Sequence, residues 1–247
     1  MAGIPDRLAP LRSVFSNPDR TSGETCRTCT TPALSAGYSN CYQCDAQARS
    51  GHLLSDVVAP ISYAVEGLQA MRDLYNYKSG SESVATRVAA RDRLLSVLYL
   101  SLDAHLGCFD GIDGIATVPS SGSRDGLHPV EQMRSLFGDG FTQLPISYAG
   151  PMGLDRAERR ILDPARFEVA PRLTAGRRVL LLDDAWVSGV HMQSAAAALK
   201  MAGASYVAAV PIGRVISPRY SESKTYLANH SLTPFDPSIC PITGLIH

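Results

Sequence analysis

The clearest pattern of hydrophobic and polar positions lies in the C-terminal half of the chain. RRVLLLD (177–183) contains an apolar run of strand length, and YVAAVPI (206–212) is a second one. Between them, Ser188 and Gly189 indicate a turn, and the alanine-rich stretch 191–201 predicts a helix. Strands that are apolar throughout, rather than at alternate positions, are typical of a parallel sheet covered on both faces. The pattern predicts a βαβ unit.

Upstream segments continue the alternation of strands and helices. VVAPISYAV (57–65) predicts a short strand, and residues 114–118 predict another, followed by a Ser/Gly loop at 119–126 and a helix that opens near His128. The stretch 83–106 predicts a long amphipathic helix, because apolar residues recur at helical spacing: Val84, Val88, Leu95, Leu98, Leu102 and Leu106. We therefore expect an α/β fold, a parallel sheet with helices on both faces, which binds ligands at the carboxyl ends of its strands.

Composition divides the 247 residues into four parts. Residues 1–23 are polar and contain three prolines, which predicts a loosely structured leader. A four-cysteine module at 24–50 precedes the α/β domain at 51–212. Residues 213–247 have four prolines and little periodicity, so we expect an irregular, packed C-terminal extension.

Two CxxC pairs predict a metal site. Cys26 and Cys29 form one pair, Cys41 and Cys44 the other, and a CxxC turn can aim both thiols at one ion. Four thiolates would complete a tetrahedral shell around a structural Zn²⁺. The metal is expected to support this module alone, leaving the α/β core folded without it. Redox pairs or unlinked thiols remain the alternative, and His52 could replace one cysteine.

The other two cysteines, Cys108 and Cys240, are isolated in the sequence. Isolated cysteines in an intracellular protein usually behave as small buried hydrophobic residues. We assign them no chemistry from the sequence.

Charge and hydropathy narrow the classes of partner. The chain has 23 basic residues (Lys and Arg) and 23 acidic residues (Asp and Glu). No global electrostatic field would therefore attract nucleic acid or an anionic membrane. The chain contains neither a signal-peptide core nor an apolar run of membrane-spanning length, which indicates a cytoplasmic protein without a membrane partner. The sequence leaves the oligomeric state open, a homo-oligomer included. The phosphate-binding motifs of P-loop and dinucleotide-binding proteins are absent.

The most informative segment is the acidic end of the first apolar run. Asp183 and Asp184 lie at the mouth of a predicted buried strand, directly before a small-residue turn and a helix. Carboxylates at this place can accept hydrogen bonds from ribose hydroxyls, while N–H groups of the turn and helix start favour a phosphate. One loop could thus hold both ends of a ribose phosphate. The alternative is that the pair merely ends the strand and caps the helix.

The segment LLLDDAWVSG resembles the PRPP loop of type I phosphoribosyltransferases, where PRPP is 5-phosphoribosyl 1-pyrophosphate. The ComF-like, competence-associated branch is more similar still, since it also begins with a four-cysteine zinc module; the resemblance spans about residues 24–212. Three further segments resemble that family in the same order: YNYKSG (75–80), ATVPSSGSRDG (116–126) and GLDRAERR (153–160), similar to its lysine turn, pyrophosphate loop and mobile arm.

The resemblance implies a Mg²⁺-dependent transfer of phosphoribose to or from an unidentified base. Such a reaction builds positive charge on the ribose and expels pyrophosphate, so it needs cations around the leaving group. Asp183, Asp184 and Arg124 are the implied catalytic residues, with Lys78 and Arg156 as further cations; each cation could equally be a solvated surface charge. His128 could contact a ligand phosphate or serve a structural hydrogen bond. The implied PRPP site comprises Lys78, Ser120, Ser121, Asp183, Asp184, Ala185, Trp186, Val187, Ser188 and Gly189.

Departures from the family pattern keep two other functions open. Val187 and His191 occupy positions where the family usually has hydroxyl residues. The family's stretch after the pyrophosphate loop is matched here only in part, by RDGLHP (124–129). These features favour the alternative of a non-catalytic module that senses PRPP or a nucleotide, or docks onto a partner. A role with nucleic acid, suggested by the family's link to DNA uptake, has poor electrostatic support.

Overall fold

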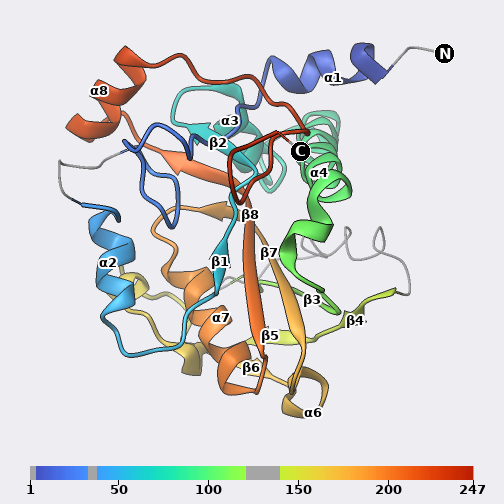
Figure 1. Cartoon of the computed structure of the whole chain (residues 1–247), viewed down its shortest axis with the longest axis vertical. Helices are drawn as coiled ribbons and strands as arrows, with labels where there is room; N and C mark the ends of the chain where they lie inside the picture. The colour runs from blue at the N-terminus through green and yellow to red at the C-terminus, as the bar shows by residue number, and fades with distance from the viewer. Residues whose placement is uncertain (1–3, 33–37, 121–139, 247) are drawn as a thin grey trace.

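A parallel β-sheet lies at the centre of the molecule (Figure 1). The computed structural model describes residues 4–32, 38–120 and 140–246. Within them the sheet has six strands in the order β1-β8-β7-β3-β4, with β2 also paired to β8, and all pairs are parallel. The strands are β1 (Val57–Val58), β2 (Ser62–Val65), β3 (Gly114–Thr117), β4 (Thr142–Gln143), β7 (Arg178–Trp186) and β8 (Tyr206–Ile216). The predicted α/β class with a mainly parallel sheet is confirmed.

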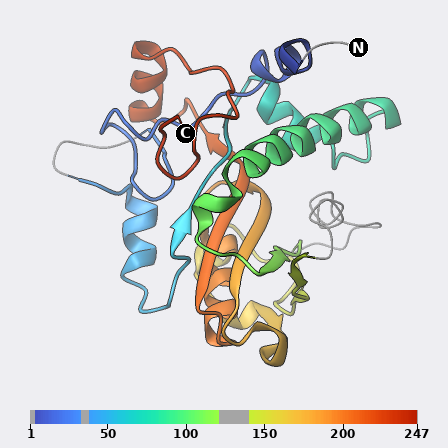
Figure 2. The same ribbon diagram turned by 45° about the vertical axis from the view of Figure 1, so that its right-hand side comes forward.

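Successive residues of β7 face opposite sides of the sheet, and both sides are covered. Leu180 and Leu182 pack in one apolar cluster with residues of α3 (Gln69–Asn76) and α4 (Val84–His105). Val179 and Leu181 pack in a second cluster, with residues of α7 (Val190–Met201). In Figure 2 the long helix α4 and α7 lie on opposite sides of β7 and β8. This burial on both faces explains why the central strands are apolar at every position.

The predicted long helix is present, but its buried face matches the predicted one only in the later turns. Helix α4 begins after Ser83, whose side chain accepts a hydrogen bond from the backbone N–H of Thr86. Val84 and Val88 stay 66% and 37% exposed, because the first turns of α4 extend beyond the sheet (Figure 2). The apolar contact with the sheet begins only in later turns, at Leu94, Val97, Leu98 and Leu102.

The two ends of the chain pack against each other. The sequence predicted a loose leader, but the described residues form α1 (Ile4–Arg12), followed by Phe15, which is fully buried. The backbone N–H of Phe235 donates to Phe15 O at 2.9 Å. The C-terminal part is also more regular than predicted, since β8 continues past residue 212 and α8 (Ser221–Asn229) follows. These long-range contacts hold the proline-containing segments that the sequence predicted to be irregular.

Smaller elements surround the sheet. A separate antiparallel pair, β5 (Ile146–Tyr148) and β6 (Phe167–Val169), lies near α7, and the segment similar to a mobile arm contains a short 3₁₀ helix that contacts α7. The remaining elements are α2 (Tyr42–Ala48), α6 (Pro171–Thr174), η1 (Leu106–Phe109), η3 (Glu158–Arg160) and η4 (Pro164–Arg166). The predicted helix near His128 and most of the Ser/Gly loop lie outside the described residues. Among the described helices, none combines the length and apolar character needed to cross a membrane.

Candidate functional site

The acidic pair lies at the carboxyl end of β7, where β7 is flanked by β3 and β8. Both carboxylates are buried, and Asp183 Oδ1 accepts the backbone N–H of Asp184 at 2.8 Å. Burial first, and then the neighbouring charge of Asp184, raise the pKa of Asp183 well above its usual value. A carboxylate held in this way gains most from a cation or from several hydroxyl donors. The pair therefore fits a divalent ion or a polyhydroxylated ligand.

Lys78 reaches the same place from the turn after α3. Its Nζ lies 2.7 Å from Asp184 Oδ2, and Tyr77 donates its hydroxyl to that same oxygen. The lysine is largely buried, so this ion pair is less screened than one at the surface. A cation and a carboxylate from distant parts of the sequence thus face one pocket.

The loop between β7 and α7 is shaped by Gly189. This residue has φ +80°, and a Cβ built there would overlap the indole ring of Trp186. Both facts restrict the position to glycine. The side chain of Trp186 is fully buried beneath the loop, whereas Val187 is 65% exposed. Helix α7 starts directly after Gly189, and the first N–H groups of a helix lack partners within it. The loop therefore presents a helix start of the kind that can bind an anion.

One open pocket brings most of the predicted residues together. Its lining includes eight residues that the sequence singled out: Lys78, Ser120, Asp183, Asp184, Ala185, Val187, Ser188 and Gly189. Val118, Pro119, His191 and Met192 complete it. Trp186 lies in the core instead, and Arg156 is exposed on the 153–160 segment and is not part of this lining. Ser121, Arg124 and His128 lie outside the described residues.

His191 separates this pocket from a second one. Its Nε2 donates to Pro119 O at 3.0 Å, since a carbonyl oxygen can only accept. The ring also packs against Tyr148 and Phe167. Burial lowers the pKa of His191, with the nearby charge of Arg166 acting in the same direction. The imidazole is therefore neutral near pH 7 when no ligand is bound.

The second pocket adds cations that the sequence analysis missed. It is lined by Tyr148, Arg159, Arg166, His191 and Ser194, among others. Arg166 is largely buried, and its Nη2 donates to Glu158 O at 3.0 Å. The segment 153–160, which the sequence singled out, contains Arg159, but only the folding of 146–169 over α7 places Arg159 and Arg166 beside the acidic pair's pocket.

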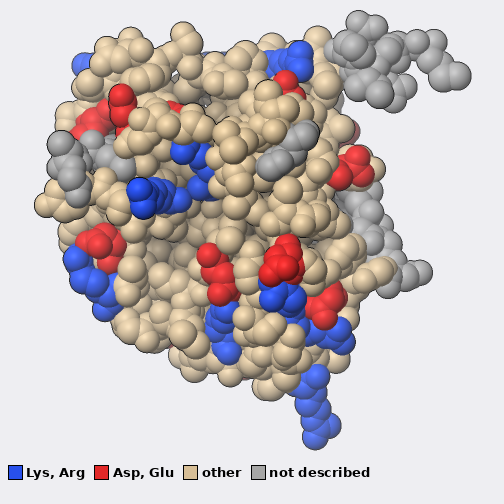
Figure 3. Space-filling view, viewed as in Figure 1, with Lys and Arg blue, Asp and Glu red and all other residues tan. Residues whose placement is uncertain are grey.

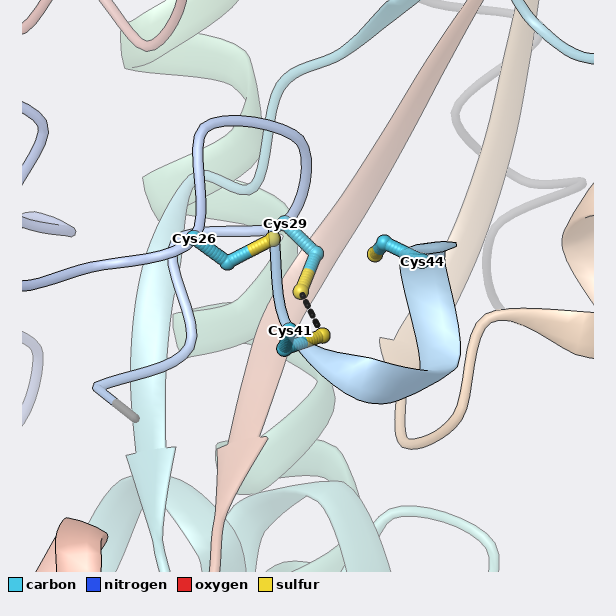
Figure 4. A group of neighbouring side chains, drawn as sticks. All are labelled: Cys26, Cys29, Cys41 and Cys44. Carbon is cyan, nitrogen blue, oxygen red and sulfur yellow. Dashed lines mark hydrogen bonds between the residues drawn. The ribbon is translucent and has the colours of Figure 1, made fainter. Parts of the chain in front are cut away.

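The four predicted cysteine ligands form one buried cluster (Figure 4). Cys26 and Cys29 come from one turn, while Cys41 caps α2 and Cys44 lies in its first turn. The four sulfurs lie within 4.8 Å of one another, and the Sγ atoms of Cys29 and Cys41 are 3.8 Å apart. A tetrahedral ion with metal–sulfur bonds of about 2.3 Å requires sulfurs about 3.8 Å apart. The cluster can hold a metal ion, and His52 is exposed outside it.

The electrostatics of the cluster favour a thiolate at Cys29, whereas contacts with the neighbouring cysteines raise the pKa of Cys41 and Cys44. Contacts from Cys26, Cys41 and Cys44, and additionally the positive charge of Arg214, hold the pKa of Cys29 well below its usual range. Thiolates, not thiols, bind metals. The residues present therefore fit a structural metal ion.

Two side chains join the cysteine cluster to the loop after β7. Arg214, buried on β8, donates from Nε to Cys29 O at 3.1 Å and from Nη1 to Trp186 O and Val187 O at 3.0 Å each. Gln47, on α2, donates from Nε2 to Ser188 O at 2.8 Å. The sequence analysis missed both residues. An arginine inside the apolar run of β8 was the available signal, because arginine is seldom buried without partners.

No protein-family model matches the chain, and no curated protein is significantly similar to it. The resemblance noted above therefore rests on the motifs, and the site rests on its geometry.

Proposed function

We propose that this protein binds PRPP or a ribose 5-phosphate nucleotide, with Mg²⁺, in the pocket at the carboxyl end of β7. The observation that carries the proposal is the meeting of Asp183 and Asp184 with the start of α7 in one pocket. Carboxylates there accept hydrogen bonds from the ribose hydroxyls, and the loop 187–189 with the first turn of α7 receives the 5′-phosphate. The reaction we propose is transfer of phosphoribose to or from a base.

The remaining groups suit the leaving pyrophosphate. Lys78 and Ser120 line the same pocket, so the lysine could approach a phosphate oxygen if it exchanged its contact with Asp184. Mg²⁺, when bound with PRPP, would neutralise charge on the pyrophosphate and so aid its departure. Asp183 would hold that ion or the ribose, and either partner would favour its charged form.

We assign Zn²⁺ to the four-cysteine cluster. Four thiolates leave no open coordination position, which makes such an ion structural rather than catalytic. The ion would fix Cys29, whose carbonyl oxygen accepts from Arg214 of β8, and α2, which carries Gln47. Both side chains also bind the loop 186–189, called the ligand loop below.

A non-catalytic sensor of PRPP or a nucleotide is the second candidate. The exposed Val187 places an apolar side chain on the loop assigned to the phosphate, where a hydroxyl would donate a hydrogen bond. A nucleic-acid role has less support, because most acidic and basic groups on the face in Figure 3 lie close to one another.

Calorimetric titration of PRPP, with and without Mg²⁺, tests the proposal. We expect Mg²⁺-dependent binding that Asp183→Asn weakens by about 10- to 150-fold, since the lost charge-assisted hydrogen bonds contribute about 1.5–3 kcal/mol. Asp92→Asn, on the exposed side of α4, is the control and should bind as the wild type does. Absence of PRPP binding by the wild type would overturn the assignment. Binding without pyrophosphate release from PRPP in the presence of a panel of free bases would favour the sensor.

A further inference from the structure

The fold brings together three metal-ligating side chains that the sequence keeps apart. His105 ends α4, Cys108 lies in η1, and Cys240 belongs to the C-terminal segment. Their ligand atoms all lie within 4.8 Å of one another. His105 and Cys240 are buried, while Cys108 is exposed. The group is separate from both the four-cysteine cluster and the pocket beside β7.

The orientation of His105 suits a metal ligand. Its Nε2 lies 2.8 Å from Pro237 O, and a carbonyl oxygen can only accept, so Nε2 carries the proton. In a neutral imidazole the other nitrogen, Nδ1, then keeps its lone pair, and it lies 3.9 Å from Cys108 Sγ. Histidines that bind metals usually donate their second nitrogen to a carbonyl or carboxylate in this way.

Cys240 lies in a closed turn. The turn is closed by hydrogen bonds from Cys240 N to Leu245 O and from Gly244 N to Cys240 O, each 2.8 Å long. Gly244 has φ +75°, which favours glycine. The turn therefore fixes the position of Cys240, whose sulfur lies within 4.8 Å of the other two ligand atoms.

We propose that His105, Cys108 and Cys240 form a second metal site, which takes Zn²⁺. Two thiolates and one imidazole are ligands that Zn²⁺ prefers over Mg²⁺ or Ca²⁺. Three protein ligands leave the fourth position to water, next to the exposed Cys108. The ion would link the end of α4 to the C-terminal segment, two parts of the chain that lie far apart in sequence.

Metal stoichiometry under reducing conditions tests this second site. Zn²⁺ titrated into metal-free protein should bind at two sites per chain in the wild type and at one in Cys108→Ser, which changes an exposed residue and should leave the fold intact. The double variant Cys26→Ser with Cys29→Ser should keep one site. Asp103→Asn, an exposed change on α4, is the control and should keep both. Co²⁺ bound at the second site should show the light absorption of thiolate coordination. Cys108→Ser should remove that absorption.

Cys108→Ser should lower the Zn²⁺ affinity of the second site by at least about 10- to 100-fold. Changing even a residue that only hydrogen-bonds to a metal ligand has an effect of this size. One Zn²⁺ per chain in the reduced wild type would overturn the proposal. So would an unchanged stoichiometry in Cys108→Ser. The reduced protein could also bind no second Zn²⁺ and form a Cys108–Cys240 disulfide in air. That result would identify the group as a thiol pair instead of a metal site.

Discussion

Asp183 is buried next to another carboxylate, and this placement has a consequence for stability. A carboxyl group whose pKa is higher in the folded than in the unfolded protein stabilises the fold when the pH lies below the unfolded pKa. This stabilisation is lost as the pH rises through the folded pKa. The unfolded value is about 4. The ligand-free protein should therefore lose stability above that pH, because folding then requires a buried charge or a bound proton.

Asp183→Asn should remove this loss. Asparagine keeps an oxygen to accept the N–H of Asp184 and carries no charge, so the ligand-free variant should be at least as stable as the wild type near neutral pH. Urea unfolding near pH 4 and near pH 7 measures the effect, which should grow with pH. Asp184→Asn is the matched control and should destabilise instead, because Lys78 and Tyr77 lose a charged acceptor. Lower stability of Asp183→Asn at neutral pH would contradict the raised pKa.

Gly189 offers a second prediction at the scale of one residue. Gly189→Ala forces a Cβ into the space of the Trp186 ring at a positive φ, so it should lower the free energy of unfolding by about 2–4 kcal/mol. Gly176→Ala is the matched control, because Gly176 also has a positive φ, +76°, but open space around its Cβ position. That control should cost only about 1–2 kcal/mol. Thermal or urea unfolding of both variants checks the difference; equal losses would show that the indole contact does not constrain the loop.

At the scale of elements, β8 connects the cysteine cluster to the ligand loop through Arg214. Replacing this side chain in Arg214→Met would leave Cys29 O, Trp186 O and Val187 O without their shared donor. We expect a loss of about 3 kcal/mol or more in unfolding free energy, since each buried unsatisfied group costs about 1–3 kcal/mol. PRPP affinity should fall as well. Gln47→Ala breaks a single contact to Ser188 O and should cost only about 1 kcal/mol. Wild-type stability of Arg214→Met would show that the bridge is dispensable.

Local patterns in the sequence predicted the elements well. The apolar run from residue 179 to 182 predicted β7, and spacing predicted α4 to within one residue at each end. The face of α4 was partly wrong, because the pattern records which residues are apolar and not where the sheet ends beneath the helix. The sequence also predicted Asp183, Asp184 and Lys78 as site residues, and the structure places them around one pocket.

Contacts between distant segments could not be predicted in this way. Neither the bridge from Arg214 to Val187 nor the meeting of His105 with Cys240 has a periodic or motif signature. Each depends on how β8 and the C-terminal segment return to earlier parts of the chain. For the same reason the first and last segments looked loose in the sequence, although Phe15 and Phe235 are fully buried.

At the scale of the whole molecule, the cysteine cluster and the α/β domain share one core. Cys26, Cys29, Cys41 and Cys44 belong to the same apolar cluster as Ala195 and Leu199 of α7. The sequence predicted a separate module whose metal could be lost while the α/β core stays folded. The shared core and the contacts of Gln47 and Arg214 predict instead that the metal supports the ligand loop.

Removal of the metal from this cluster should therefore weaken PRPP binding from a distance. Cys26→Ser with Cys29→Ser leaves the proposed second metal site untouched, so any change is due to the four-cysteine cluster. We expect a lower unfolding temperature and a decrease in PRPP affinity of about 5- to 150-fold, the usual range of coupling between two sites. Faster amide hydrogen exchange at residues 186–190 would locate the cause in the loop. Wild-type protein stripped by a chelator should recover its affinity when Zn²⁺ is returned, whereas the double variant should not. Unchanged PRPP affinity and unchanged exchange in the double variant would mean that the cluster and the loop are neighbours without energetic coupling.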